Sequence, residues 1–213
     1  AYESDEKSVY VKASNTYECT QIIEIKLRFY TTINLVPVVL ESCFIPANPS
    51  TASFNLTTAN VSTLPNVTKK FYLTMADATA GTNELLPQNN YISQSKDIYV
   101  KVTDENGCYA YVKITLKVLP PVYSTVLKDK TICVEDRTTL DAGPGFSGYE
   151  WSTGATTQSI SGVSVGSYWV KLKTGNCITT QTVNVNPTTQ PVIASIDIAN
   201  NTITVNATGG TTP

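Results

Sequence analysis

The chain of 213 residues has no histidine, a single methionine and only five cysteines, none of which forms a CxxC pair. A zinc site therefore lacks its usual ligands. The commonest general base, histidine, is also missing. We therefore expect no catalytic residue, no cofactor and no metal, and we predict that the segment is not an enzyme.

Charge is also scarce, because only 15% of residues are charged and the formal net charge is −2, with no basic stripe. This balance argues against a nucleic acid or an anionic membrane as partner. No run of apolar residues approaches the length of a transmembrane helix, and the start AYESDEKSVY does not resemble a signal peptide. We expect neither nucleic-acid binding nor membrane insertion.

Short alternating strands with turn residues between them dominate the sequence. The clearest case is Tyr99–Cys108 (YVKVTDENGC), followed by YAYVKITLKV, a pattern typical of a β-hairpin. Similar hairpins occur at Tyr10–Cys19 and Tyr168–Cys177, and in each the tyrosine precedes the cysteine by nine positions. Three copies indicate tandem modules, each of which ends in such a hairpin.

Alternation also predicts which aromatic residues are exposed. In the third hairpin, which is one residue shorter when aligned on its Val-Lys-apolar core, Tyr168, Val170 and Leu172 should face the core. Trp169 should face water, as should Tyr10 and Tyr99 in the other copies. These three aromatics are candidates for contact with a sugar ring or a neighbouring module, and the alternative is that they cover their own strand beside a lysine stem.

The strand pattern predicts an all-β protein built from tandem immunoglobulin-like β-sandwich modules. The predicted divisions are residues 1–31, the C-terminal hairpin of a truncated module; 32–119 and 122–187, two complete modules; and 192–213, the start of a further repeat. Leu119-Pro120-Pro121 is the clearest linker.

Trp151 falls in mid-strand, where such sandwiches place a core tryptophan, with a ligand platform as the alternative. Leu35–Leu40, which contains Pro37, suggests an edge strand.

Each complete module has one cysteine near its start and one at its closing hairpin. We predict the disulfides Cys43–Cys108 and Cys133–Cys177, with Cys19 unpaired in this segment. The alternative is pairing across module joints, since Cys19 and Cys43 are 24 residues apart and Cys108 and Cys133 are 25 apart. We prefer the intramodule pairs because a hairpin tip and the start of the next module should lie beyond disulfide reach.

Disulfides imply an oxidising, extracellular setting, against the alternative of reduced thiols in a cytosolic protein. The acidic residues vary between copies and lie in turns, so solvated turn residues are the preferred interpretation. A calcium site among Asp129, Glu135 and Asp136 is the alternative, although it lacks the dense ligand spacing of a dedicated loop.

The run CVEDRTTLDAGPGFSGYEWSTGATTQSISGVSVGSYWVKLKTGNC, residues 133–177, resembles the Ig-like/PKD-like tandem repeats of large type IX-secreted surface proteins of Bacteroidetes, flavobacteria among them. The stretches FNLTTANV, FYLTMADATAGTNEL and DIYVKVTDENGCYAYVKITLKV resemble a sister repeat, and VNATGGTTP resembles the opening of a third type found in gliding-motility adhesins. The resemblance implies type IX export and a location outside the cell or on the bacterial cell surface.

Together these features predict a non-catalytic stalk or spacer segment of a secreted cell-surface adhesin, with gliding as the associated process. The alternative is a spacer or a glycan-binding module of a secreted multidomain polysaccharide-degrading enzyme, because the same repeats occur in such enzymes. The expected partners are neighbouring modules of the same chain, and the further candidates are surface glycans or other cell-surface proteins.

Overall fold

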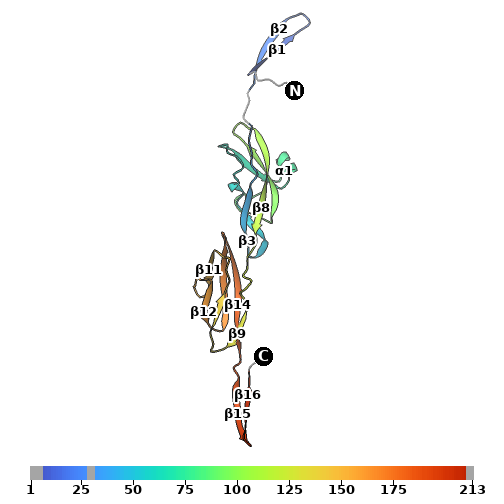
Figure 1. Cartoon of the computed structure of the whole chain (residues 1–213). Coiled ribbons are helices and arrows are strands. Elements are labelled where there is room, and N and C mark those ends of the chain that lie inside the picture. The colour runs from blue at the N-terminus through green and yellow to red at the C-terminus, as the bar shows by residue number, and fades with distance from the viewer. Residues whose placement is uncertain (1–6, 28–31, 210–213) are drawn as a thin grey trace. The chain divides into compact units, whose positions relative to one another are not determined.

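The computed structural model describes residues 7–27 and 32–209, and most of them lie in strands (Figure 1). The ends of the predicted divisions 1–31 and 192–213 lie outside the described residues. The strands are β1 (Ser8–Ser14), β2 (Thr20–Lys26), β3 (Val39–Ile45), β4 (Asn48–Phe54), β5 (Thr68–Tyr72), β6 (Tyr91–Ser93), β7 (Lys96–Thr103), β8 (Tyr109–Leu119), β9 (Lys130–Cys133), β10 (Thr138–Asp141), β11 (Gly148–Trp151), β12 (Ser159–Val163), β13 (Gly166–Thr174), β14 (Cys177–Thr188), β15 (Val192–Ala199) and β16 (Thr202–Thr208). A 3-10 turn, Leu56–Thr58, and one short helix, α1 (Met75–Ala80), are the remaining elements of the described residues.

The chain divides into two compact units. The second takes Glu41–Phe54, Ile92–Lys96 and the residues from Leu116 onward, and the first takes the remainder. Most of the β3–β4 hairpin therefore belongs to the same unit as the C-terminal half of the chain. Among the described residues, no helix is long and apolar enough to cross a membrane.

Two hairpins form sheets of their own, β1 with β2 and β15 with β16, both antiparallel. The tip of the first contains Cys19, as the alternation predicts. The second turns at Asn200 and Asn201, which both have positive φ values, 47° and 60°. Asparagine tolerates this left-handed conformation better than most residues, which explains why the turn forms at Asn200-Asn201.

The central region forms a six-stranded sheet in the order β5-β7-β8-β3-β4-β6. Its buried residues follow the predicted alternation, as in Ile98, Val100 and Val102 of β7 and Ile114 and Leu116 of β8. The expectation of an edge strand at Leu35–Leu40 is wrong. Because Pro37 has no N–H to donate, strand β3 starts only at Val39, and it lies inside the sheet between β8 and β4.

Residues 130–188 form a β-sandwich from the pair β10-β12 and the sheet β11-β13-β14-β9. The side chains between the two sheets are Leu127, Leu140, Ala142, Trp151, Ile160, Val163, Val170, Leu172, Val183 and Val185. Trp151 is 1% exposed, and its Nε1 donates to Thr157 O at 2.8 Å, so the prediction of a core tryptophan is confirmed. The chain is all-β and its sandwich is immunoglobulin-like, as predicted.

Candidate functional site

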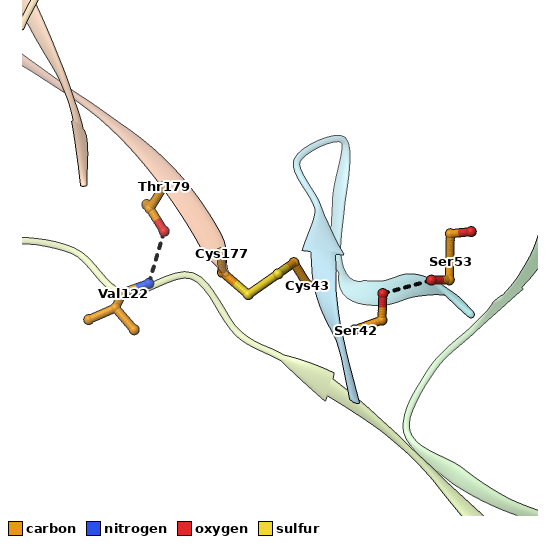
Figure 2. The surroundings of a disulfide bond; sticks show 6 residues. All are labelled: Ser42, Cys43, Ser53, Val122, Cys177 and Thr179. Atoms are coloured by element: carbon orange, nitrogen blue, oxygen red, sulfur yellow. Dashed lines mark hydrogen bonds between the residues drawn. A yellow bond between two sulfur atoms is a disulfide. The ribbon is translucent and has the colours of Figure 1, made fainter. Parts of the chain in front are cut away.

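The most distinctive chemical feature is a disulfide between Cys43 on β3 and Cys177 at the start of β14 (Figure 2). The S–S distance is 2.09 Å and the Cα atoms are 5.3 Å apart, although 134 positions separate the two residues. Cys108 and Cys133 are free and half-buried, and Cys19 is free and exposed. The predicted pairs Cys43–Cys108 and Cys133–Cys177 are therefore wrong, and so is the alternative of Cys19–Cys43 and Cys108–Cys133.

The direction of β3 explains why Cys43 cannot reach Cys108. Thr115 N–H donates to Val38 O at 3.0 Å, and Lys117 Nζ pairs with Glu41 Oε1 at 2.8 Å. The two contacts join residues 77 and 76 positions apart. Because this separation stays nearly constant as both strands advance, β3 and β8 run in parallel, and Cys43 lies level with the end of β8. Cys108 precedes the start of β8, whose eleven residues span about 36 Å. A disulfide needs Cα atoms within about 7 Å.

The same geometry separates Cys133 from Cys177. Strand β9 runs parallel to β14, and Cys133 is level with Thr188, the last residue of that strand. Cys177 is its first residue. The incorrect prediction places both cysteines at one end of a module. The missing signal is strand direction, because a first strand that runs parallel to the last strand carries its cysteine to the end opposite the hairpin tip.

Side chains of β14 next to Cys177 hold the residues after the Pro120-Pro121 linker (Figure 2). Thr179, which is 3% exposed, accepts a hydrogen bond at Oγ1 from Val122 N–H at 3.1 Å. Gln181 binds the backbone of Ser124 twice: its Oε1 accepts from N–H at 2.7 Å and its Nε2 donates to O at 3.2 Å. We call Cys43, Cys177, Thr179, Gln181 and their contacts Val122 and Ser124 the disulfide site.

Each partner of the disulfide has a defined local setting. Cys177 is 6% exposed and lies on the same face of β14 as Thr179 and Gln181, because these residues alternate along the strand. On β3, the neighbouring Ser42 donates from Oγ to Ser53 O of β4 at 2.7 Å (Figure 2). The two sulfur atoms are therefore presented by hydrogen-bonded strands rather than by loops.

The tips of the first two hairpins share one turn geometry. Asn15 Oδ1 accepts from the N–H groups of Tyr17 and Cys19, at 3.0 and 3.1 Å. Asp104 Oδ1 accepts in the same way from Asn106 and Cys108, both at 2.9 Å. These side chains satisfy turn N–H groups that would otherwise lack partners. Cys19 and Cys108 therefore occupy equivalent positions.

The three candidate aromatics lie in three different sheets, Tyr10 on β1, Tyr99 on β7 and Trp169 on β13. Tyr10 is 69% exposed, whereas Tyr99 and Trp169 are half-buried. Lys171 Nζ lies 5.2 Å from the centroid of the Trp169 ring and pairs with Glu150 at 2.8 Å, so this lysine covers part of the ring. A ligand role for these aromatics stays a prediction.

Of the acidic residues considered for calcium, Asp129 uses its carboxylate in a structural contact. Its Oδ1 accepts from Asn184 N–H of β14 at 2.7 Å, whereas Asp136 is held through its backbone N–H, which donates to Cys133 O at 3.0 Å. Over residues 7–27 and 32–209, no group of three or more metal-ligating side chains of the His, Cys, Asp and Glu types comes together.

Asp97 and Asp141 are among the carboxyl groups that have lowered pKa values. Hydrogen bonds from Lys113 and Thr115 lower the pKa of Asp97, and those from Gln158 and the Gly143 N–H lower the pKa of Asp141. Both groups lie at the surface, where they fasten one strand or turn to another. The covalent chemistry that the described residues show is the cross-linking of two strands by Cys43–Cys177.

Comparison with solved structures finds chains of linked immunoglobulin domains. Titin domains Z1Z2 in complex with telethonin are 15% identical, with 75% of this chain and 96% of that chain covered and a TM-score of 0.27. Sidekick-1 immunoglobulin domains 1–4 are 11% identical, covering 89% and 62%, with a TM-score of 0.28. Domains 3–5 of Drosophila OTK are 10% identical, covering 78% and 67%, at 0.29. The fold assignment rests on the sheets and the core described above.

The comparison with curated proteins gives no match. A family model does match: residues 39–122 fit the Flavobacterium inter-domain disulphide bond domain. The matched segment begins at the first residue of β3, contains Cys43 and ends at Val122 of the disulfide site. This match supports a flavobacterial Ig-like domain in the chain, and Cys43–Cys177 links its strand β3 to a strand of the sandwich that comes after it.

Proposed function

We propose that this chain is part of the stalk of a secreted flavobacterial cell-surface adhesin, in which a disulfide joins each Ig-like module to the next. In this proposal the complete modules are residues 32–119 and 122–187, export is by the type IX route, and gliding is the associated process. The observation that carries the proposal is the Cys43–Cys177 bond between strands of two different sheets.

The position of this bond decides which residues would carry tension. Tension that enters along β3 passes at Cys43 through the disulfide to Cys177 and leaves along β14. The 133 residues between the two cysteines lie in a closed loop outside this covalent path. They include strands β4 to β13, so unfolding of these strands adds no length to the stalk while the bond is intact.

Both strands of this path have neighbours on either side. Strand β3 lies between β8 and β4, and β14 lies between β13 and β9. Hydrogen bonds of Thr179 and Gln181 to Val122 and Ser124 hold the linker against the same strand. A stalk under load benefits from this arrangement, because force passes through hydrogen-bonded interior strands and a covalent bond that bypasses the linker.

Single-molecule force spectroscopy tests the proposal. The chain is pulled from its two ends under oxidising conditions and again as the variant Cys43→Ser/Cys177→Ser. We expect the variant to gain about 450 Å more contour length, since the 133 released residues extend by about 3.4 Å each. The control variant, Cys108→Ser/Cys133→Ser, should extend like the unmodified chain. Equal extension of all three chains would contradict the proposal.

A cellular experiment separates an adhesin stalk from a spacer in a secreted enzyme. Cells that display the parent protein with Cys43→Ser/Cys177→Ser should keep normal surface amounts but detach under lower shear than unmodified cells. If detachment under shear is unchanged while enzymatic activity of the secreted protein falls, the spacer interpretation replaces the adhesin.

A further inference from the structure

The free cysteines occupy the same positions as the two partners of the closed disulfide. Cys43 lies level with Leu119, which is eleven residues after Cys108, and Cys133 is paired with Thr188, which is eleven residues after Cys177. Cys133 is therefore the equivalent of Cys43 on a first strand. Cys108, like Cys19, is the equivalent of Cys177 at a hairpin tip.

We infer that Cys133 forms a second inter-module disulfide, with the hairpin-tip cysteine of a module that comes after residue 188. The inference rests on the proposed function, because it requires tandem modules. It also goes further than the family match, since Cys133 lies outside residues 39–122. Cys108 then awaits the first-strand cysteine of a module that precedes its own, so that every joint is crossed by one bond.

The main support for this pairing is the strand register of Cys133. The observation that Cys133 is a free thiol is weaker support. In the closed pair, the first-strand cysteine is level with the last residue of β8, and the linker Pro120-Pro121 starts immediately afterwards. Cys133 is level with the last residue of β14 in the same way. A module attached after Thr188 by the same linker therefore places its own hairpin tip beside Cys133, as Cys177 is placed beside Cys43.

Cys133 is also suited to bond formation. It is the last residue of β9, its carbonyl accepts from Asp136 N–H at 3.0 Å, and its side chain is half-buried rather than enclosed in the core. The reaction joins the two sulfur atoms. Two thiols lose two protons and two electrons to a small disulfide such as oxidised glutathione, whose S–S bond breaks to give two glutathione thiols.

A duplicated chain tests the inference: residues 1–188 joined directly to residues 120–213. This junction places Pro120 after Thr188, as it stands after Leu119 in the first joint. After oxidative refolding with a glutathione pair, alkylation and non-reducing peptide mapping, we expect two linked peptides, Cys43 with Cys177 of the first copy and Cys133 of the first copy with Cys177 of the second. Alkylation of the first Cys133 should fall roughly tenfold relative to the 213-residue chain.

Each outcome has one meaning. If Cys43–Cys177 forms but Cys133 of the first copy remains alkylated, the inference is wrong and the proposed function stands. If neither bond forms, both are wrong. The duplicated chain with Cys177→Ser in its second copy should leave the first Cys133 free. Because the duplicated chain could misfold, the parent protein isolated from cells is mapped as well, and an alkylated Cys133 there overturns the inference.

Discussion

Cys43 and Cys133 occupy equivalent places in two sheets, yet only Cys43 is bonded. Each lies on a first strand parallel to a last strand, level with the end of that strand, and far from the hairpin tip of its own sheet. They differ in the segment that comes next: the sandwich after β8 presents Cys177, whereas the residues after β14 form the hairpin β15–β16, which has no cysteine. For these two cysteines, pairing therefore follows whether the segment that comes next presents a cysteine.

The largest effect on stability should come from removing the Cys43–Cys177 disulfide. Cys43→Ser/Cys177→Ser opens a loop of 134 positions, and on the chain-entropy model this costs about 5 kcal/mol of unfolding free energy. Urea unfolding of the oxidised chain measures it. Cys108→Ser/Cys133→Ser is the matched control, and its change should stay within about 0.5 kcal/mol. Similar losses in the two variants would show that Cys108 or Cys133 is also bonded.

The second prediction disturbs the sandwich that presents Cys177. Trp151→Ala removes the largest core side chain of that sandwich and should cost about 3–5 kcal/mol. The yield of the Cys43–Cys177 bond on oxidative refolding should fall with it, as read by peptide mapping. Trp169→Ala, on the outer side of β13, should cost about 1 kcal/mol or less and leave the yield unchanged. A Trp151→Ala chain that forms the bond at full yield would mean that the fold of the sandwich does not position Cys177.

A smaller effect should result from loosening the linker beside the disulfide. Thr179→Val keeps the shape of the side chain but removes the acceptor for Val122 N–H, which should cost about 1–2 kcal/mol. Thr180→Val, on the exposed side of the same strand, is the control, and its change should remain within about 0.5 kcal/mol. Thermal unfolding compares the two variants. Equal midpoints would show that the hydrogen bond of Thr179 to Val122 does not stabilise the chain.

The smallest effect should be a loss of stability in acid. It compares Asp97 of the central sheet with Asp141 of the sandwich. The pKa values of Asp97 and Asp141 are lowered in the folded chain, so each group stabilises the fold above its unfolded pKa of about 3.9, and this contribution is lost as the pH falls through the folded pKa. Unfolding midpoints should therefore be level near neutral pH and fall below about pH 4.

The dependence on salt should distinguish the contribution of Asp97 from that of Asp141. The main partner of Asp97 is the charged Lys113, whereas Asp141 accepts mainly from the neutral Gln158 and Gly143. Added salt should therefore weaken the effect of Asp97→Asn more than that of Asp141→Asn. Midpoints measured at about pH 3 and pH 6, at low and high salt, test this, and equal salt dependence would contradict the assignment of partners.

Much of the fold can be predicted from local pattern. Alternation predicts the inward side of β13, where Val170 and Leu172 are buried, and the position of Trp151 in mid-strand predicts its place in the core. The disulfide cannot be predicted in this way, because pairing depends on whether β3 runs parallel or antiparallel to β8. The parallel arrangement brings together residues far apart in the sequence, such as Glu41 and Lys117, 76 residues apart, and it leaves no periodic signal. The predicted strand at Pro37 is misplaced because proline shifts the start of β3.

The central claim is that the first cysteine of one module bonds to the hairpin tip of the next. Non-reducing peptide mapping of the oxidised 213-residue chain, alkylated before digestion, tests it most directly. We predict one linked pair, Cys43 with Cys177, and three alkylated residues, Cys19, Cys108 and Cys133. Reduction should release the linked pair and no other. A linked peptide that joins Cys43 to Cys108, or Cys133 to Cys177, would contradict the account.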